Sequence, residues 1–195
     1  AEETGLICEL GRQVMRKSCM ELMQRMDVDH RLRLSVNVSV VQLRCDPGLV
    51  EFVESALRES GLPAERLEIE VTESLFLDPA LAEVGRQLEA LAALGIQLSI
   101  DDFGTGYSSL AYLNRFPFSR IKIDRSFVNR LDNDPDSQAI VSAIVGLGQS
   151  LAKSTTAEGV EQEEQLALLT RLGCHEVQGF LLGKPQPLSA FAKLG

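Results

Sequence analysis

Two adjacent carboxylates, Asp101 and Asp102, stand in the stretch LSIDDFGTGYSS, which runs from Leu98 to Ser109. Neighbouring negative charges repel each other, and a bound divalent cation would offset that repulsion because hard cations prefer oxygen ligands. The alternative is a solvated turn with an aspartate cap, since Asp and Gly are common turn residues. The choice between the two depends on which other side chains the fold brings to the same place.

Polar side chains recur at or near the C-terminal ends of the predicted strands. They are Asn37, Glu70, Asp101, Lys122, Glu158 and Gln178. Consecutive members are about one strand-helix unit apart. In a (β/α)₈ barrel the C-terminal ends of all strands share one rim, and that rim carries the active site. Such a barrel would bring all six side chains into a single bowl.

The expected bowl is rich in negative charge. Lys122 alone cannot balance Glu70, Asp101, Asp102 and Glu158, and a buried unpaired charge costs several kcal/mol. Two divalent cations could balance them. The set contains neither His nor Cys, which favours Mg²⁺ or Mn²⁺ over zinc. Two such ions about 3.5–4 Å apart suit in-line attack on a phosphoryl group.

Alternating strands and helices must position these residues, and the sequence predicts parallel βαβ units in an α/β fold. Strands are expected at 34–40, 67–71, 98–101, 120–124, 155–158 and 176–181. Helices are expected up to about Met26, from 46–47 to Gly61, from 78–79 to Gly95, and at 108–114, 136–151, 162–172 and from Leu188. The spacing in the first helix predicts a buried stripe of Leu10, Val14, Leu22 and Met26. No linker or low-complexity segment interrupts residues 1–195, which we expect to form a single domain.

Composition narrows the classes of partner. The 195 residues are 45% hydrophobic and 24% charged, with a net charge of −9. This charge argues against DNA, RNA or an anionic membrane as a partner. The four cysteines show no C-x-x-C spacing and are typical of reduced thiols. With no membrane-length apolar run, a cytoplasmic location is expected, or the cytoplasmic face of a membrane-anchored parent.

Six motifs in order resemble the EAL domain family, the bacterial cyclic di-GMP phosphodiesterases. They are VNVS (36–39), LEIEVTES (67–74), DDFGTGYSSL (101–110), IKIDRSFV (121–128), AEGVE (157–161) and QGFLLGKPQP (178–187). The similarity begins at Ala1 with AEETGLI and runs nearly to the end of the chain. The resemblance implies a TIM-type (β/α)₈ barrel that hydrolyses cyclic di-GMP to linear pGpG with Mg²⁺ or Mn²⁺.

The resemblance also implies metal ligands. Asn37, Glu70 and Asp101 would hold one ion, and Asp101, Asp102 and Glu158 would hold the second, with Asp101 bridging.

Four further residues receive roles in the same way. Lys122 would lie near the attacking water and help to orient or deprotonate it. Gln178 would help to fix the metal–water or substrate network, and Glu73 would anchor the 101–109 loop. Glu161 would contact the metal ligands without binding the metal itself.

The sequence departs from the family pattern at its start. The family takes its name from a Glu-Ala-Leu segment on an early strand, whose Glu is a further metal ligand. No strand predicted here carries that segment, and six predicted strands fall short of the eight of a barrel. We therefore expect the first strands to be missing and this portion alone to be weakly active or inactive.

Two alternatives to an enzyme stay open: a receptor that binds cyclic di-GMP without cleaving it, and a regulatory interaction module. A homodimer and attached sensor or GGDEF-type domains are further expectations from the resemblance.

Overall fold

The computed structural model describes residues 1–2, 5–24, 32–106, 110–187 and 190. The chain divides into two compact units. Unit 1 comprises residues 1–71, 77–98 and 186–195, and unit 2 comprises residues 72–76 and 99–185. Among the described residues, no helix has the length and apolar character needed to span a bilayer.

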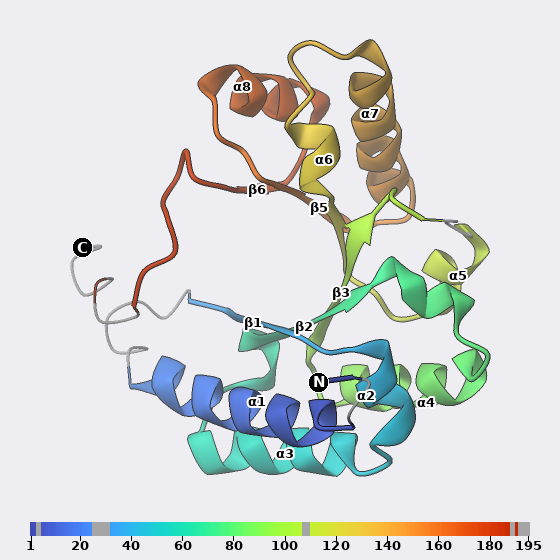
Figure 1. Cartoon of the computed structure of the whole chain (residues 1–195), viewed down its shortest axis with the longest axis vertical. Helices are drawn as coiled ribbons and strands as arrows, with labels where there is room; N and C mark the ends of the chain where they lie inside the picture. Colours follow the sequence, from blue (N-terminus) through green and yellow to red (C-terminus); the bar gives the residue numbers. More distant parts are fainter. Residues whose placement is uncertain (3–4, 25–31, 107–109, 188–189, 191–195) are drawn as a thin grey trace. The chain divides into compact units, whose positions relative to one another are not determined.

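Unit 1 contains two paired strands, with helix α1 before the first strand and further helices after each strand (Figure 1). Its elements are α1 (Ile7–Met23), β1 (Leu34–Asn37), α2 (Val40–Cys45), α3 (Leu49–Ser60), the 3₁₀-helix η1 (Ala64–Arg66), most of β2 (Leu67–Thr72) and α4 (Leu81–Ala93). Strands β1 and β2 run parallel, with Val36 opposite Ile69 and Asn37 opposite Glu70. Both strands were expected from their alternating sequence.

Helix α3 ends where predicted but begins at Leu49 rather than at 46–47, because Asp46 follows the end of α2 and Gly48 precedes the first turn of α3. Leu49, Val53 and Leu57 are buried. The helix ends at Gly61, whose φ of 75° lies in the left-handed region that glycine adopts without steric cost. The Gly61 N–H donates to the Leu57 carbonyl at 2.8 Å.

Helix α1 corrects part of the predicted core. Leu22 is buried as predicted, but Leu10 and Val14 are 50% and 46% exposed, and Met15 and Cys19 are buried in their place. The helix has apolar residues on more than one face, and its packing against α3 selects the face that is buried. The expected extension to Met26 lies outside the described residues.

The strand predicted for 34–40 is also shorter than expected, because a helix takes its last residue. Ser39 caps α2, and its hydroxyl accepts a hydrogen bond from the Val41 N–H at 3.1 Å. A serine at this position favours helix initiation because its side chain satisfies an otherwise unpaired backbone donor.

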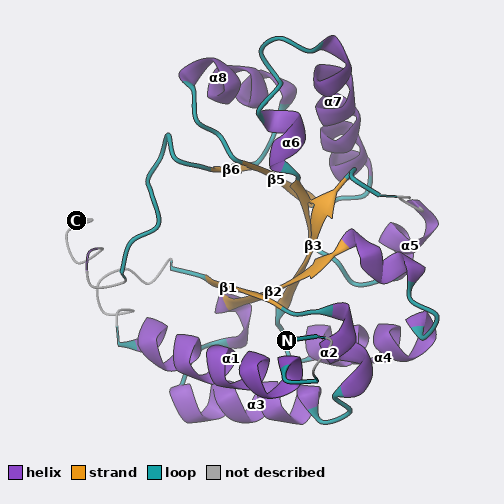
Figure 2. Cartoon of the chain, viewed as in Figure 1, coloured by secondary structure: helices purple, strands orange, loops and turns teal. Residues whose placement is uncertain are grey.

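Unit 2 is a parallel sheet with helices between its strands (Figure 2). Its elements are most of the 3₁₀-helix η2 (Glu73–Leu77) and of β3 (Gln97–Phe103), then α5 (Leu110–Arg115), β4 (Arg120–Ile123), α6 (Arg125–Val128), α7 (Pro135–Ser150), β5 (Ser154–Glu158), α8 (Glu163–Leu172) and β6 (Glu176–Gln178). The strand order is β3-β4-β5-β6. Opposite residues include Ile100 with Ile121 and Glu158 with Gln178.

The predicted strands and helices of unit 2 are confirmed with small changes at their ends. Strand β4 stops one residue early, because Asp124 caps the short helix α6, which the sequence pattern missed. Strand β6 ends at Gln178 rather than residue 181. Residues 108–109 of the predicted helix 108–114, and nearly all of the tail helix expected from Leu188, lie outside the described residues.

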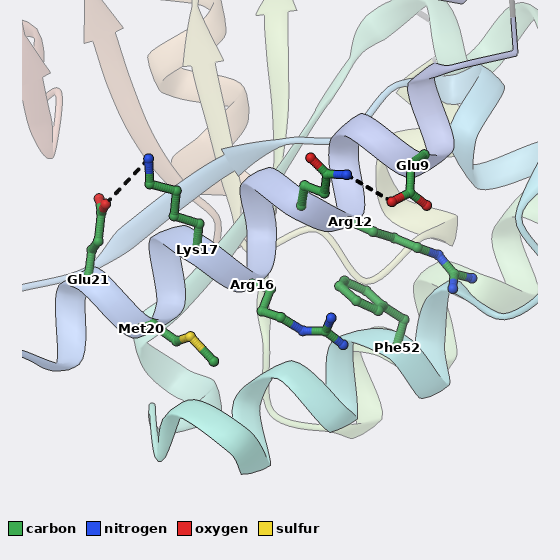
Figure 3. Close-up of a pocket in the computed structure, with 8 residues that line it drawn as sticks. Glu9, Arg12, Arg16, Lys17, Met20, Glu21 and Phe52 are labelled. Carbon is green, nitrogen blue, oxygen red and sulfur yellow. Dashed lines mark hydrogen bonds and ion pairs between the residues drawn. The ribbon is translucent and has the colours of Figure 1, made fainter.

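A hollow of about 430 Å³ lies between α1 and α3 of unit 1 (Figure 3). The guanidinium groups of Arg12 and Arg16 each lie 5.1 Å from the centre of the Phe52 ring. All three cationic side chains of the lining are paired: Arg12 with Asp46, Arg16 with Glu59 and Lys17 with Glu21. The hollow therefore offers packing and paired surface charges rather than reactive groups.

Candidate metal and active site

Asp101 and Asp102 lie in a β-bulge of β3. Ile100 pairs with Ile121 and Phe103 pairs with Ile123, so two residues of β3 face only Lys122 on β4. A regular strand would send adjacent side chains to opposite faces, and a bulge changes that alternation. Asp102 has a φ of 54°, in the left-handed region that Asp tolerates better than most residues. The bulge thus allows the carboxylates of both Asp101 and Asp102 to contribute to one site.

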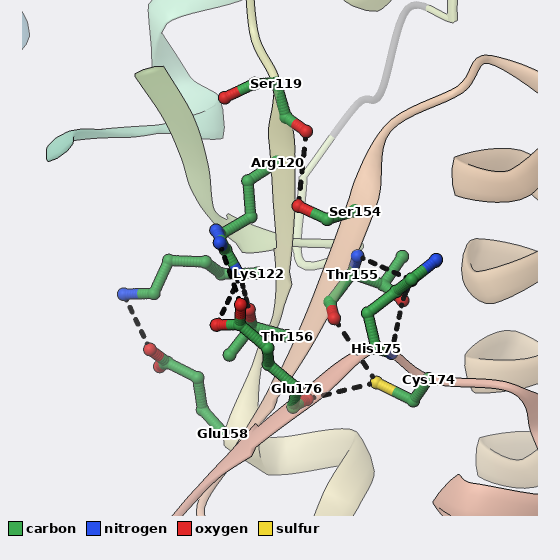
Figure 4. A network of polar contacts seen from close by, with 10 residues as sticks. All are labelled: Ser119, Arg120, Lys122, Ser154, Thr155, Thr156, Glu158, Cys174, His175 and Glu176. Atoms are coloured by element: carbon green, nitrogen blue, oxygen red, sulfur yellow. Dashed lines mark hydrogen bonds and ion pairs between the residues drawn. The ribbon is translucent and has the colours of Figure 1, made fainter. Parts of the chain in front are cut away.

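Three carboxylates gather at that place. Asp101, Asp102 and Glu158 each offer one oxygen, and these oxygens all lie within 4.8 Å of one another. Asp101 is buried, Glu158 is half-buried and Asp102 is exposed. Lys122 joins them from β4: its Nζ lies 2.6 Å from Oε1 of Glu158 and 3.2 Å from Oδ1 of Asp101. Figure 4 shows the Lys122 ammonium turned toward Glu158.

The pKa of Asp102 responds to its surroundings although much of the residue is exposed. Partial desolvation raises this pKa above its usual value, the nearby charges of Asp101 and Asp124 raise it further, and Lys122 offsets part of the effect. The charges that contribute are those of neighbouring carboxylates, which a bound cation would counter.

Asp124 is a neighbour of the cluster to which the sequence analysis assigned no role in the site. Burial acts to raise its pKa, but hydrogen bonds from Ser126 and from Asp102 outweigh burial, and the pKa of Asp124 is lowered. Its Oδ1 accepts the Ser126 N–H at 3.0 Å. The available signal was its position, directly after the strand that carries Lys122.

Glu73 holds the loop that follows the bulge. Its Oε2 accepts hydrogen bonds from the N–H groups of Gly104 at 2.9 Å and of Gly106 at 3.3 Å. Gly104 has a φ of 99°, which a residue with a side chain would adopt only under strain. Glu73 itself is buried, so the contact restrains the backbone immediately after Asp101 and Asp102.

Gln178 and Glu158 are register partners on β6 and β5. Both line a hollow of about 220 Å³, together with Arg125, Asn129, Gly159, Glu161, Gly179 and Phe180. The amide side chains of Gln178 and Asn129 and the guanidinium of Arg125 therefore line the same hollow as Glu158, a member of the carboxylate cluster. Glu161, expected to support the ligands, belongs to this lining.

Asn37 and Glu70 lie in unit 1 and are opposite each other on β1 and β2. Glu70 is buried, and its carbonyl accepts the Val38 N–H at 2.9 Å. The structure therefore places two of the predicted ligands side by side. Their sharing of one rim with Asp101 stays a prediction.

The chemistry of the donor set suits a hard divalent cation. Asp101, Asp102 and Glu158 are oxygen donors of like charge at close range, and the charge of Asp101 contributes to the raised pKa of Asp102 after desolvation. Oxygen donors of this kind fit Mg²⁺ or Mn²⁺ better than a metal that prefers nitrogen or sulfur.

A Glu-Ala-Leu tripeptide does occur in the chain, at residues 89–91, but not on a strand. It lies within helix α4, where Glu89 is exposed and Leu91 is buried in the core. The tripeptide is thus part of an ordinary amphipathic helix and cannot be the strand segment after which the family is named.

Comparison with known proteins places this geometry in context. The EAL domain family model matches residues 1–185. A relative from Pseudomonas aeruginosa, the bifunctional diguanylate cyclase/cyclic di-GMP phosphodiesterase MucR, is 49% identical over 188 residues, which are 96% of this chain and 27% of that protein. The cyclic di-GMP phosphodiesterase PdeR of Escherichia coli is 39% identical over 99% of this chain and 29% of its own length.

A solved structure, PaMucR phosphodiesterase in a c-di-GMP complex, agrees with a TM-score of 0.91 at 48% identity, over 97% of this chain and 76% of that one. The chain spans little more than a quarter of the length of these two curated relatives. The family model, the two relatives and the solved structure each match nearly all residues of this chain. The chain belongs to the EAL domain family.

Proposed function

We propose that the protein carrying this chain hydrolyses one phosphodiester bond of cyclic di-GMP to give linear pGpG, with Mg²⁺ or Mn²⁺ as cofactor. The observation that carries the proposal is the cluster of Asp101, Asp102 and Glu158 with Lys122. Relatives that align with almost the whole chain are named cyclic di-GMP phosphodiesterases. The proposal includes the TIM-type (β/α)₈ architecture of the family.

Asp101, Asp102 and Glu158 would hold one cation in this proposal, and Asn37 and Glu70 keep their predicted ligand roles for another. When bound, such ions lower the pKa of a coordinated water and neutralise negative charge on phosphoryl oxygens. Asp102 must be ionised to act as a ligand, and positive charge placed nearby would lower its raised pKa.

Lys122 would act on the attacking water from its place between Glu158 and Asp101. Its ammonium is buried and held by two carboxylates, so it is oriented before substrate arrives. A substrate with negative phosphates also gains from this fixed positive charge. Lys122 is thus proposed to orient the attacking water as an ammonium, whereas deprotonating the water would require its neutral amine.

Glu73 and Gln178 would position rather than react. Glu73 fixes the loop after the two aspartates through the N–H groups of Gly104 and Gly106. Gln178 sits opposite Glu158 and offers an amide to the hollow where the substrate or its water network would lie.

The remaining parts of the proposal concern the wider protein. Residues 1–195 would form one EAL domain, working as a homodimer in the cytoplasm or at its membrane face. Sensor or GGDEF-type domains would be attached, in keeping with relatives several times longer than this chain.

The decisive experiment incubates purified protein carrying this chain with cyclic di-GMP and Mn²⁺ or Mg²⁺, and separates the products by ion-exchange chromatography. We expect pGpG to appear, to disappear when EDTA is added, and to be absent with Asp101→Asn. Metal-independent binding of cyclic di-GMP without product would contradict hydrolysis and favour the receptor. Neither binding nor product from folded protein would favour an interaction module.

A further inference from the structure

A second layer of polar side chains lies two residues before the candidate site on three strands of unit 2. The layer consists of Arg120 on β4, Thr156 on β5 and Glu176 on β6, which precede Lys122, Glu158 and Gln178. Because side chains alternate along a strand, residues two apart lie on one face. The layer is therefore on the face of the carboxylate cluster, one step nearer the start of each strand.

Arg120 joins the three strands through its guanidinium group (Figure 4). Its Nη1 donates to Oγ1 of Thr156 at 2.8 Å and lies 2.5 Å from Oε2 of Glu176. Its Nη2 donates to Oε1 of Glu176 at 3.1 Å. Arg120 and Thr156 are both buried. A planar guanidinium that meets both oxygens of one carboxylate has a well-defined orientation, which a lysine cannot reproduce.

Within this layer, the positive charge of Arg120 is paired with the carboxylate of Glu176. These contacts give the layer a geometric influence on the cluster above. Lys122 is directly opposite Thr156 in the β4–β5 register, and the Lys122–Glu158 distance of 2.6 Å depends on how these two strands are held together.

We propose that Arg120 is a positioning residue for the Lys122–Glu158 pair. Its contact with Thr156 fixes β5 against β4 one step before Glu158, and its contact with Glu176 does the same for β6 before Gln178. Partners behind metal ligands typically change metal affinity or activity by 10–100-fold when they are lost. The part of this inference that concerns turnover rests on the proposed function.

Two variants that preserve net charge test the proposal. Arg120→Lys keeps the positive charge but loses the planar guanidinium that contacts both oxygens of Glu176. Thr156→Val keeps the shape of the side chain but loses its hydroxyl. Ser137→Ala is the matched control: Ser137 is also buried in unit 2, and its hydroxyl donates to Asp134 at 2.6 Å. For each protein we would measure the melting temperature, the Mn²⁺ dissociation constant by calorimetry, and kcat and KM for cyclic di-GMP.

We expect both layer variants to bind Mn²⁺ about tenfold more weakly and to lose about tenfold in kcat, with KM within about twofold of wild type. Ser137→Ala should lower only the melting temperature. A purely structural role for Arg120 would move the melting temperature of all three variants and leave the Mn²⁺ constant and kcat unchanged, which overturns the proposal.

The two hypotheses fail in different ways. Wild-type protein that binds Mn²⁺ but forms no pGpG would refute the proposed function, and the Mn²⁺ constants of the variants would still decide the role of Arg120. Wild-type protein that binds no Mn²⁺ would refute both. Should Arg120→Lys not fold, the Mn²⁺ constant of Thr156→Val decides between a positioning and a purely structural role.

Discussion

The ammonium of Lys122 lies 2.6 Å from a carboxylate oxygen of Glu158 and also contacts Asp101 at 3.2 Å. One positive charge thus serves two carboxylates, while the neighbouring Asp102 has a raised pKa. The cluster is not self-neutralising, and this local deficit distinguishes it from an ordinary ion pair. A divalent cation at Asp101, Asp102 and Glu158 would remove the deficit.

Glu158→Gln should abolish turnover while leaving stability nearly unchanged. The amide keeps the shape of the half-buried side chain but is a poor ligand for a hard cation, and Lys122 retains its contact with Asp101. We expect kcat to fall by at least about a hundredfold. Product formation from cyclic di-GMP and a thermal melt measure the two effects.

A control for this variant is Glu163→Gln, which makes the same chemical change in the exposed first turn of α8. It should behave as wild type in both assays. Turnover that survives in Glu158→Gln would rule out Glu158 as a metal ligand.

Asp102→Asn should raise the melting temperature of the metal-free protein and lower it, relative to wild type, when metal is bound. The pKa of Asp102 is raised in the folded protein, so the stability it contributes is present at low pH and is lost as the pH rises through that pKa. The neutral amide removes this loss, and metal-free Asp102→Asn should melt about 2 °C above wild type at pH 7.5. The difference should shrink as the pH falls and Asp102 takes up its proton.

With Mn²⁺ added, wild type should melt at a higher temperature than Asp102→Asn, because wild type can hold the ion with a carboxylate that the variant lacks. Melting curves at pH 4.5 and 7.5, with EDTA and with Mn²⁺, test this reversal of the two melting temperatures. A variant less stable than wild type in EDTA at pH 7.5 would contradict a charge deficit at the cluster.

The strand-helix order could be predicted from sequence, because hydrophobic alternation and glycine stops are local signals. The buried face of α1 was predicted only in part. Leu22 is buried as predicted, but Leu10 and Val14 are exposed, and Met15 and Cys19 are buried instead. An apolar stripe on an isolated helix does not specify which face its neighbour will cover, and that choice is made by packing.

The candidate site was predictable by residue type and only partly by geometry. Strand ends indicated Asp101, Lys122 and Glu158, but strict alternation would have sent Asp102 to the opposite face. The bulge between Ile100 and Phe103 resolves this conflict, and no residue in the stretch marks it unambiguously. Likewise Arg120 carried no motif signal, because its role depends on register with two other strands.

Cysteine reactivity should follow burial and pKa. Burial raises the pKa of Cys19 to about 11, so only about one molecule in a thousand carries the thiolate at pH 8. Burial also raises the pKa of Cys174, whereas Cys45 is exposed. In a short pulse of iodoacetamide followed by mass spectrometry, Cys45 should be modified first and Cys19 last. Early modification of Cys19 in folded protein would contradict its burial in α1.

Glu73→Ala should impair turnover through the loop rather than through direct chemistry. The substitution leaves the N–H groups of Gly104 and Gly106 without their shared carboxylate, immediately after Asp101 and Asp102. We expect kcat and Mn²⁺ affinity each to fall about tenfold or more. Glu73→Gln should lie between Ala and wild type, since an amide oxygen can still accept both hydrogen bonds with less strength.

Ser74→Ala is the matched control for Glu73→Ala, because it removes a neighbouring hydroxyl whose partner is Thr72 rather than the glycine loop. It should leave kcat and Mn²⁺ affinity unchanged. The graded order Ala below Gln below wild type is the result that distinguishes loop anchoring from general destabilisation. Should Glu73→Ala keep wild-type kcat in folded protein, the two hydrogen bonds would have no part in setting the positions of Asp101 and Asp102.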